Sequence, residues 1–255
     1  MSSVTQQERE MQQREALLLG DEAMDRLHAM RVIVFGVGGV GSWCAEALVR
    51  SGIRQITIVD SDTVCITNCN RQLMALPANI GRVKVEAMKE RLLALNPDCE
   101  VTALAQRYTP ESAESFHLEQ YDAVVDAIDS LECKAHLILH ATRISKERKL
   151  TLVSSMGAAL RLDPFSVRQS EFWNIQGDAL ARALRNKFKK WNQYPARKFR
   201  CVYSIEPAMK NLGDQHPVEE LEGQKRAQIN GSVVQITAVF GMAIASIIIN
   251  EVLQR

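Results

Sequence analysis

The sequence predicts an α/β protein in which helices cover both faces of a doubly wound, mainly parallel sheet. Two observations predict this class. Short apolar strands alternate with longer helical segments along residues 1–155, and each parallel crossover needs its own helix. A glycine-rich turn also joins the first strand to the helix that follows it. After Ser155 the spacing becomes irregular, so we expect the rest of the chain to form a smaller C-terminal α+β lobe.

Strands are expected where β-branched and apolar residues form short runs, at residues 31–35, 55–59, 99–104, 123–125 and 150–154. Helices are expected where apolar residues recur at helical spacing, at residues 39–50, after Gly81 as far as Leu95, and at residues 131–144, with one more helix ahead of the first strand.

The second half of the chain predicts two further helices. Residues 179–191 place Leu180, Leu184, Phe188 and Trp191 on one inward face. The apolar run from Val233 to Ile249 contains Gln235, Thr237 and Ser246 and is short for a membrane span. We therefore expect a buried C-terminal helix and no membrane span. The stretch from Asn211 to Gln228, with glycine and proline among charges, predicts a loop.

Composition limits the functional classes. Of 255 residues, 46% are hydrophobic and 24% charged, which is typical of a folded globular protein. The 31 basic and 30 acidic residues nearly cancel, so no global field attracts nucleic acid or membrane. The polar N-terminus does not resemble a secretory signal, so we expect a cytoplasmic protein. The six cysteines are expected to be reduced thiols rather than a disulfide framework, and the lack of a Cys-x-x-Cys pair argues against a structural zinc site.

The glycine-rich turn predicts a site for a nucleotide. The pattern Gly36-x-Gly38-Gly39-x-Gly41 follows a strand and opens a helix, so its backbone can approach a polyphosphate at a helix N-terminus. Asp60 ends the next strand, where it can accept hydrogen bonds from ribose hydroxyls. The motif alone fits either NAD or ATP.

Charged residues at neighbouring strand ends favour a triphosphate. Arg71 and Lys84 can neutralise phosphate charge, and Asp129 can hold Mg²⁺, which prefers oxygen ligands. A nicotinamide enzyme has no need of two cations and a further carboxylate at this edge. The sequence therefore predicts binding of ATP with Mg²⁺.

The order GVGGVG, IVDSD, NxNRQ, GRVK and DAIDS resembles the ATP-binding core of the ThiF/MoeB/HesA superfamily, the adenylating relatives of ubiquitin-activating enzymes. The likeness extends from about Arg14 through the segment Val202-Tyr203-Ser204-x-Glu206-Pro207 to the C-terminus, and is weaker over residues 170–198. It is greatest to the branch that dehydrates N6-threonylcarbamoyladenosine in tRNA. The resemblance implies a Rossmann-like fold and attack of a substrate carboxylate on the α-phosphate of ATP.

The resemblance also implies roles for individual residues. Gly36, Gly38, Gly39 and Gly41 would line the phosphates and Asp60 the ribose, with Arg71 and Lys84 at the triphosphate and Asp129 at the magnesium. Supporting hydrogen bonds are assigned to Asn68, Asn70 and Gln72, and a lesser role to Asp62, for which a solvated loop carboxylate is an equal alternative. Arg14 would reach across a homodimer into the neighbour's triphosphate. Residues 1–155 would then be the ATP-binding domain with an N-terminal helix, and residues 156–255 a lobe facing tRNA together with the C-terminal helix.

The leading hypothesis is ATP-dependent cyclisation of N6-threonylcarbamoyladenosine in tRNA through an adenylated carboxylate. Ring closure within one molecule needs no protein nucleophile. One alternative is adenylation of a ubiquitin-like sulfur carrier, whose enzymes usually have paired Cys-x-x-Cys ligands that this chain lacks. Another is a non-catalytic NAD-binding module. A sulfur-relay partner or another partner protein is left open.

A local basic segment predicts where tRNA binds. Between Arg182 and Arg200 there are eight basic residues and no acidic ones. We expect the phosphate contacts to come from Lys187, Lys189, Lys190, Arg197, Lys198 and Arg200. Trp191, Tyr194 and Phe199 could stack on unpaired bases, although Trp191 and Phe199 are equally compatible with a core. His136 and His140 are expected on a helix surface without a ligand role.

Overall fold

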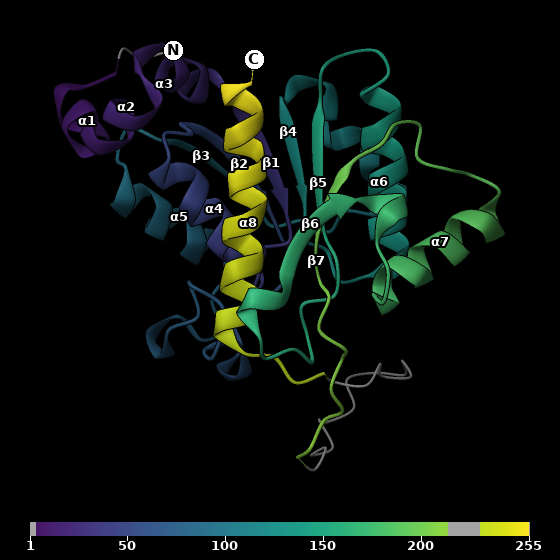
Figure 1. Cartoon of the computed structure of the whole chain (residues 1–255). Helices are drawn as coiled ribbons and strands as arrows, with labels where there is room; N and C mark the ends of the chain where they lie inside the picture. Colours follow the sequence, from purple (N-terminus) through teal and green to yellow (C-terminus); the bar gives the residue numbers. More distant parts are fainter. Residues whose placement is uncertain (1–3, 214–229, 255) are drawn as a thin grey trace.

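Seven strands form one sheet in the order β3-β2-β1-β4-β5-β7-β6 (Figure 1). The computed structural model describes residues 4–213 and 230–254. The strands are β1 (Arg31–Phe35), β2 (Gln55–Val59), β3 (Glu100–Leu104), β4 (Ala123–Asp126), β5 (Thr151–Ser155), β6 (Val167–Glu171) and β7 (Arg200–Ser204). All neighbouring strands are parallel except β6, which runs antiparallel to β7 at the sheet edge. The predicted mainly parallel sheet is confirmed.

Helices α4, α5 and α6 alternate with strands as the pattern predicts, whereas three short helices stand ahead of the first strand where one was expected. They are α1 (Gln6–Met11), α2 (Gln13–Leu19), α3 (Asp21–Ala29), α4 (Gly41–Arg50), α5 (Lys84–Leu95), α6 (Leu131–Ile144), α7 (Ala179–Trp191) and α8 (Val234–Leu253). Short 3-10 turns occupy the connections at Ile66–Asn68, Pro77–Asn79, Ala113–Phe116, Leu118–Gln120, Pro164–Ser166 and Phe172–Asn174. Most of the loop expected between Asn211 and Gln228 lies outside the described residues.

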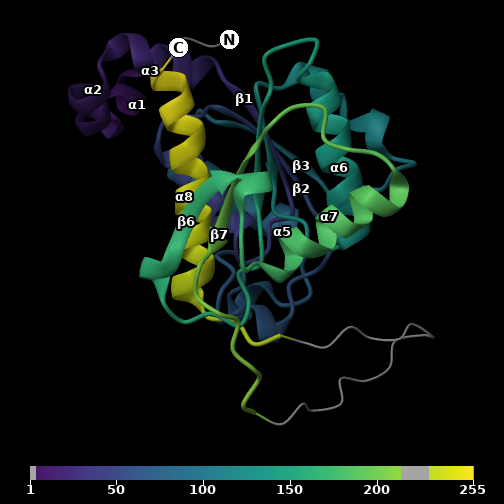
Figure 2. The same ribbon diagram turned by 45° about the vertical axis from the view of Figure 1, so that its right-hand side comes forward.

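Alternation along the strands builds two cores. In β1, Val32 and Val34 face the core under α4, α5 and α8, whereas Ile33 and Phe35 face the core under α6 and α7. Successive strand side chains point to opposite faces of a sheet, so one short apolar strand contributes to both cores. Figure 2 shows α8 on one side of the sheet and α6 with α7 on the other.

One helix begins later than its sequence pattern predicts. The helix expected from Gly39 begins at Gly41, because the residues before it form the phosphate loop. The helix expected after Gly81 begins at Lys84 and ends at Leu95. Gly81 has a φ of 85° and its N–H donates to the Val64 carbonyl, so this stretch pairs with the chain after β2 instead of opening the helix.

The C-terminal helix α8 belongs to the core. By length and composition, it is the one helix among the described residues that could cross a membrane. Ile236, Phe240, Ile244 and Ile248 nevertheless form a buried stripe at helical spacing, packed with α4 and the sheet. A Cβ at Gly241 would lie 2.6 Å from the Val40 carbonyl oxygen and 2.7 Å from Trp43 Cβ. Glycine therefore permits the close approach of α8 to α4.

The strand order fixes where a ligand can bind. The chain leaves β1 towards β2 on one side, and β4 pairs with β1 on the other side. Connections after β1 and β4 therefore diverge, and such a switch point opens a crevice at the carboxyl ends of the strands. All the charged motifs predicted from the N-terminal half follow strands that end at this edge.

Candidate nucleotide site

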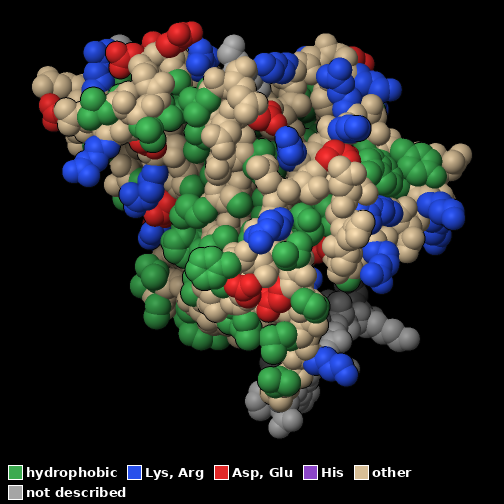
Figure 3. All heavy atoms as spheres, viewed as in Figure 1, with side chains coloured by type: hydrophobic (Ala, Val, Ile, Leu, Met, Phe, Trp, Pro, Cys, Tyr) green, Lys and Arg blue, Asp and Glu red, His purple; other side chains and the backbone are tan. Residues whose placement is uncertain are grey.

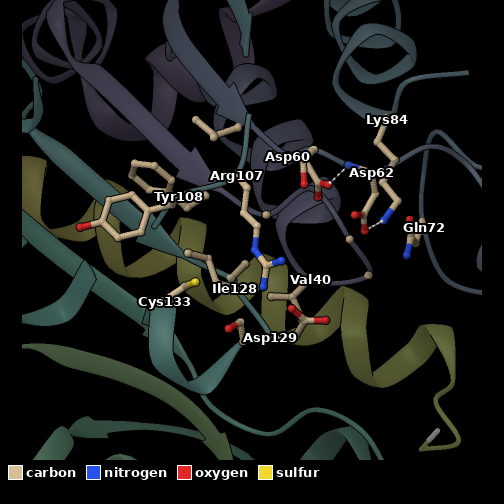
Figure 4. Close-up of a pocket in the computed structure, with 18 of the residues that line it drawn as sticks. Val40, Asp60, Asp62, Gln72, Lys84, Arg107, Tyr108, Ile128, Asp129 and Cys133 are labelled. Carbon is tan, nitrogen blue, oxygen red and sulfur yellow. Dashed lines mark hydrogen bonds and ion pairs between the residues drawn. The ribbon is translucent and has the colours of Figure 1, made fainter. Parts of the chain in front are cut away.

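A cavity of about 420 Å³ opens at the carboxyl ends of β1, β2 and β4. Its lining includes most of the predicted site residues, namely Gly36, Gly38, Gly39, Asp60, Asp62, Arg71, Gln72, Lys84 and Asp129. Figure 4 shows Asp60, Asp62 and Lys84 on one side of the cavity and Asp129 on another. The fold thus gathers Gly36 and Asp129, which are 93 positions apart in the sequence, into one cavity.

The turn between β1 and α4 has the geometry of a phosphate loop. Gly36 has a φ of 85°, and a Cβ there would lie 2.6 Å from the Ala127 carbonyl oxygen. A Cβ at Gly41 would lie only 1.8 Å from the Gly36 carbonyl oxygen. The backbone N–H groups of Gly38 and Gly39 donate to no described residue, so they are available to phosphate oxygens at the N-terminus of α4.

Asp60 is held by the backbone at the end of β2. Its Oδ2 accepts a hydrogen bond from the Val37 N–H at 2.9 Å, and its Oδ1 accepts one from the Asp62 N–H at 2.9 Å. Each carboxylate oxygen retains a further lone pair. Asp60 can therefore accept hydrogen bonds from a ribose while it fixes the phosphate loop.

Lys84 forms a partly shielded ion pair in the cavity. Its Nζ lies 2.8 Å from Asp62 Oδ2, and the lysine side chain is 8% exposed while that of Asp62 is 65% exposed. The solvent-exposed carboxylate of Asp62 therefore orients the Lys84 ammonium group. Asp62 lines the cavity and is at the same time a largely solvated loop carboxylate.

Arg71 is held by neutral oxygens. Its Nη1 donates to the Thr67 carbonyl and to Asn70 Oδ1, both at 2.9 Å. Burial lowers the pKa of Arg71 from its ordinary value. No carboxylate pairs with this guanidinium among the described residues, so its charge is available to an anionic ligand.

Asp129 lies on the loop after β4, and hydrogen bonds fix the start of this loop. At the end of β4, Asp126 Oδ2 accepts hydrogen bonds from Lys134 Nζ at 2.8 Å and from Ser154 Oγ at 2.6 Å, and all three side chains are buried. Asp126 Oδ1 also accepts from the Ile128 N–H at 3.2 Å. The Asp129 carboxylate is exposed to the cavity and accepts no hydrogen bond from a described residue.

The donor set fits Mg²⁺ bound together with phosphates. Among residues 4–213 and 230–254, no group of three or more His, Cys, Asp or Glu residues could hold a metal ion alone. Mg²⁺ is usually held by one or two carboxylates together with phosphate oxygens and water. Asp129 can supply such a carboxylate.

Several residues that line the cavity escaped the sequence analysis. Gln106, Arg107 and Tyr108 follow β3, and Cys133 and Thr237 come from α6 and α8. The Arg107 side chain extends into the middle of the cavity (Figure 4), and its guanidinium makes no hydrogen bond or ion pair with a described residue. The sequence could have indicated these three residues, because β3 is parallel to β2 and the residues after it lie at the same sheet edge as the motifs after β1, β2 and β4.

Four of the predicted residues lie outside the cavity lining. Gly41 acts through the loop packing described above. Asn68 accepts a hydrogen bond from the Cys65 N–H and Asn70 donates to the Ser232 carbonyl, so both organise the segment that carries Arg71. Arg14 is an exposed residue of α2, outside this chain's own cavity.

The basic segment lies over α7 and the turn after it, where Lys and Arg side chains gather in Figure 3. Lys189, Lys190, Lys198 and Arg200 are exposed. Lys187 pairs with Glu132 at 3.6 Å and lies over the Trp191 ring, 4.7 Å from its centroid.

Arg185 and Phe199 of this segment are not available to RNA, and Phe199 belongs to the core, which is one of the two alternatives left open for it. Arg185 is not free for phosphate, because its Nη2 donates to the Phe172 and Ile175 carbonyls at 2.7 and 2.6 Å. Phe199 is buried and stacks on Phe172 with centroids 5.0 Å apart, so it cannot receive a base. Tyr194 is 53% exposed and Trp191 is half-buried. Arg197 donates to the Ser145 carbonyl at 2.9 Å.

The expectation that His136 and His140 lie on a helix surface is wrong. His140 is buried, His136 is half-buried, and both hydrogen-bond through Nδ1 to the Tyr108 hydroxyl. Burial lowers the pKa of both histidines. The reason for the error is tertiary: the segment after β3 covers this face of α6 and brings Tyr108 to it.

Comparison with known proteins agrees with the site. The model of the ThiF family matches residues 12–255. The tRNA threonylcarbamoyladenosine dehydratase of Haemophilus influenzae is 34% identical over 244 residues, which cover 92% of this chain and 90% of that protein.

Two structures of the Escherichia coli tRNA N6-threonylcarbamoyladenosine dehydratase are similar to the whole chain, each at 32% sequence identity. The complex with AMP has a TM-score of 0.87 and covers 100% of this chain and 98% of that one. The complex with ATP has a TM-score of 0.84 and covers 99% and 98%.

Proposed function

We propose that this chain, which belongs to the ThiF family, is an ATP-dependent tRNA threonylcarbamoyladenosine dehydratase. The observation that carries the proposal is the cavity itself. Free loop N–H groups, three cations and an unpartnered carboxylate converge there, and this combination suits a triphosphate with a divalent cation better than a dinucleotide. The relatives that are similar over nearly the whole chain carry this activity in their names.

The reaction has two steps. The threonyl carboxylate of the modified adenosine attacks the α-phosphorus of ATP, and the bond to the β-phosphate oxygen breaks to release pyrophosphate. A nitrogen or oxygen of the carbamoyl group then attacks the activated carbonyl carbon, AMP leaves, and the carbamoyl group loses a proton from one of its N–H groups. The five-membered ring forms within one molecule, at high effective molarity, so no enzyme nucleophile is required.

The residues of the cavity divide this work. The N–H groups of Gly38 and Gly39 bind phosphate oxygens, Asp60 binds the ribose, and Arg71 and Lys84 neutralise charge on the departing pyrophosphate. Arg107 adds a third cation at the middle of the cavity. Asp129 would hold Mg²⁺, which supplies charge stabilisation to the phosphates when bound.

The tRNA would be held by Lys187, Lys189, Lys190, Arg197, Lys198 and Arg200, within the lobe formed by residues 156–255. A homodimer would place Arg14 of one subunit at the triphosphate of the other. The exposed Leu17 and Leu18 on the same helix, each 82% exposed, support this proposal because a second copy would cover them. We further propose that the protein acts in the cytoplasm, where tRNA is modified.

Mass spectrometry of tRNA nucleosides tests the function. After incubation of the protein with modified tRNA, ATP and Mg²⁺, the threonylcarbamoyladenosine peak should shift down by the mass of one water, with AMP and pyrophosphate formed in equal amounts. Omission of ATP is the matched control. An unchanged nucleoside in the presence of bound ATP would overturn the proposed substrate, whereas tighter binding of NAD than of Mg-ATP would overturn adenylation altogether.

A further inference from the structure

A second cavity, of about 490 Å³, lies beside the nucleotide site, between α6 and the turn that follows α7. We refer to it as the α6–α7 cleft. Its lining includes His136, His140 and Arg143 from α6, and Gln193 and Tyr194 from the basic segment. None of the roles assigned above uses the histidines or Arg143.

Tyr108 connects the α6–α7 cleft to the nucleotide cavity. Its ring lines the nucleotide cavity, and in Figure 4 its hydroxyl points away from Asp60 and Asp129. That hydroxyl lies 3.1 Å from Nδ1 of His136 and 3.1 Å from Nδ1 of His140. The two sites therefore share one wall.

The shared hydroxyl gives the two histidines opposite tautomers. Burial lowers the pKa of both rings, so each is neutral at physiological pH and carries one N–H. The phenol has one proton, so it donates to one Nδ1 and accepts from the other. One histidine consequently presents Nε2 as a donor and the other presents Nε2 as an acceptor.

These Nε2 atoms have no hydrogen-bond partner among the described residues. His140 is 5% exposed, and its Nε2 lies 3.8 Å from Glu114 Oε1, beyond hydrogen-bond distance. A paired donor and acceptor at the wall of a cleft matches the edge of a nucleobase, which presents donors and acceptors side by side.

The other side chains of the cleft suit the remainder of a nucleotide. Tyr194 is 53% exposed, and its ring offers a surface on which a base can stack. Arg143 is 64% exposed and lies 3.1 Å from Glu114 Oε1, which is itself 81% exposed. Such a surface pair contributes little, so a phosphate can replace Glu114 at small cost.

We propose that the α6–α7 cleft binds one unpaired nucleotide of the RNA substrate. The base stacks on Tyr194 and is read at its edge by His136 and His140, and Arg143 binds the adjacent phosphate. This inference rests on the proposed function, because it assigns a surface for the tRNA. Gln193 and Tyr194 follow the basic α7 directly, so phosphate contacts there would lead a single strand into the cleft.

Photo-crosslinking tests the site in the unaltered protein. An anticodon stem-loop RNA with 4-thiouridine in the loop should crosslink to peptides that contain Tyr194 or residues 136–143. A paired duplex RNA with the same label is the control, since its bases are stacked, and it should not crosslink there. Crosslinks confined to other peptides would overturn the proposal.

Two variants test the energetics by RNA-binding titration. Tyr194→Leu should weaken binding of the stem-loop by about fivefold or more, because a base–aromatic stack is lost. Arg143→Gln should weaken it and reduce its salt dependence. Phe165→Leu, which changes an 85% exposed aromatic outside the cleft, and Arg50→Gln, which removes a 57% exposed arginine from another ion pair, are matched controls.

The outcomes separate the two proposals. Wild-type affinity of both cleft variants, with normal ATP-dependent dehydration, would overturn the cleft and leave the function standing. Specific crosslinks in the cleft without any dehydration by the wild-type protein would overturn the proposed function and leave an RNA site. AMP or UMP binding that is lost in Tyr194→Leu, with no effect on RNA, would instead assign the cleft to free nucleotides and overturn its RNA role.

Discussion

Glycine at position 41 is required by a backbone contact, whereas glycine at position 38 is not. A Cβ at Gly41 would lie 1.8 Å from the Gly36 carbonyl oxygen, but the nearest atom to a Cβ at Gly38 is Gln72 Nε2 at 3.8 Å. Backbone atoms cannot move aside as the end of a flexible side chain can. The two positions of one motif therefore differ in what they tolerate.

Gly41→Ala should destabilise the protein and weaken ATP binding, since the phosphate loop must open to admit the methyl group. We expect a loss of about 2 kcal/mol or more in the free energy of unfolding, measured by urea denaturation, with a parallel loss of ATP affinity by calorimetry. Gly38→Ala is the matched control and should change stability little. Equal stability of both variants would contradict the loop geometry.

Asp129 is expected to act on the reaction and not on the fold. Its carboxylate lines the cavity and accepts no hydrogen bond from a described residue, so its removal breaks no structural contact. Asp129→Asn should lower ATP–pyrophosphate exchange about a hundredfold or more, because charge stabilisation at the phosphates is lost. The melting temperature should remain within about a degree of wild type.

Asp21→Asn, at an exposed position in the first turn of α3, is the control for Asp129→Asn and should exchange pyrophosphate at the wild-type rate. Normal exchange by Asp129→Asn would remove Asp129 from the proposed magnesium site.

At the scale of elements, the contact between α4 and α8 determines how the phosphate loop is supported. Gly241 allows α8 to approach the first turn of α4. Thr237, one turn earlier on α8, lines the nucleotide cavity. The C-terminal helix therefore supports the cavity as well as the core.

Gly241→Ala sets two effects against each other. Alanine favours the helix by about 1 kcal/mol, but its Cβ would lie 2.6 to 2.8 Å from Val40 and Cys44 backbone atoms, and overpacking costs about 1–3 kcal/mol. Because the clashing atoms are backbone, we expect net destabilisation of about 1 kcal/mol in urea unfolding and weaker ATP binding. Met242→Ala, on the exposed side of the same helix, should change neither. A more stable Gly241→Ala variant would show that α8 can move away without cost.

At the scale of the whole molecule, Arg14 is expected to complete the nucleotide site of a second subunit. Mixed dimers of Arg14→Ala and Asp129→Ala subunits should recover part of the activity that each homodimer lacks, because one composite site remains intact. Mixing each variant with itself is the control. Verified heterodimers without any recovery would leave Arg14 as a surface residue of α2.

The basic segment is expected to govern tRNA affinity independently of ATP. Reversal to Glu at Lys189, Lys190, Arg197 and Lys198 should weaken tRNA binding and flatten its dependence on salt, since each lost phosphate contact reduces counterion release. ATP affinity should be unchanged. Reversal of Arg9 and Lys89, on α1 and α5, is the control. Unaltered tRNA affinity would move the binding surface elsewhere.

The sequence by itself determined the features that depend on neighbours along the chain. Strand and helix positions follow from periodicity, and the phosphate loop follows from glycines between a strand and a helix. Asp60, Lys84 and Asp129 could be assigned to one edge because parallel strands end together.

Only the tertiary structure decided which distant segments meet. The segment after β3 brings Arg107 into the nucleotide cavity and Tyr108 between His136 and His140. The rings of Phe172 and Phe199 stack in the core, although Phe199 lies in the basic segment. The physical reason is that local patterns specify which face of an element is buried, whereas strand order and loop path determine what covers that face.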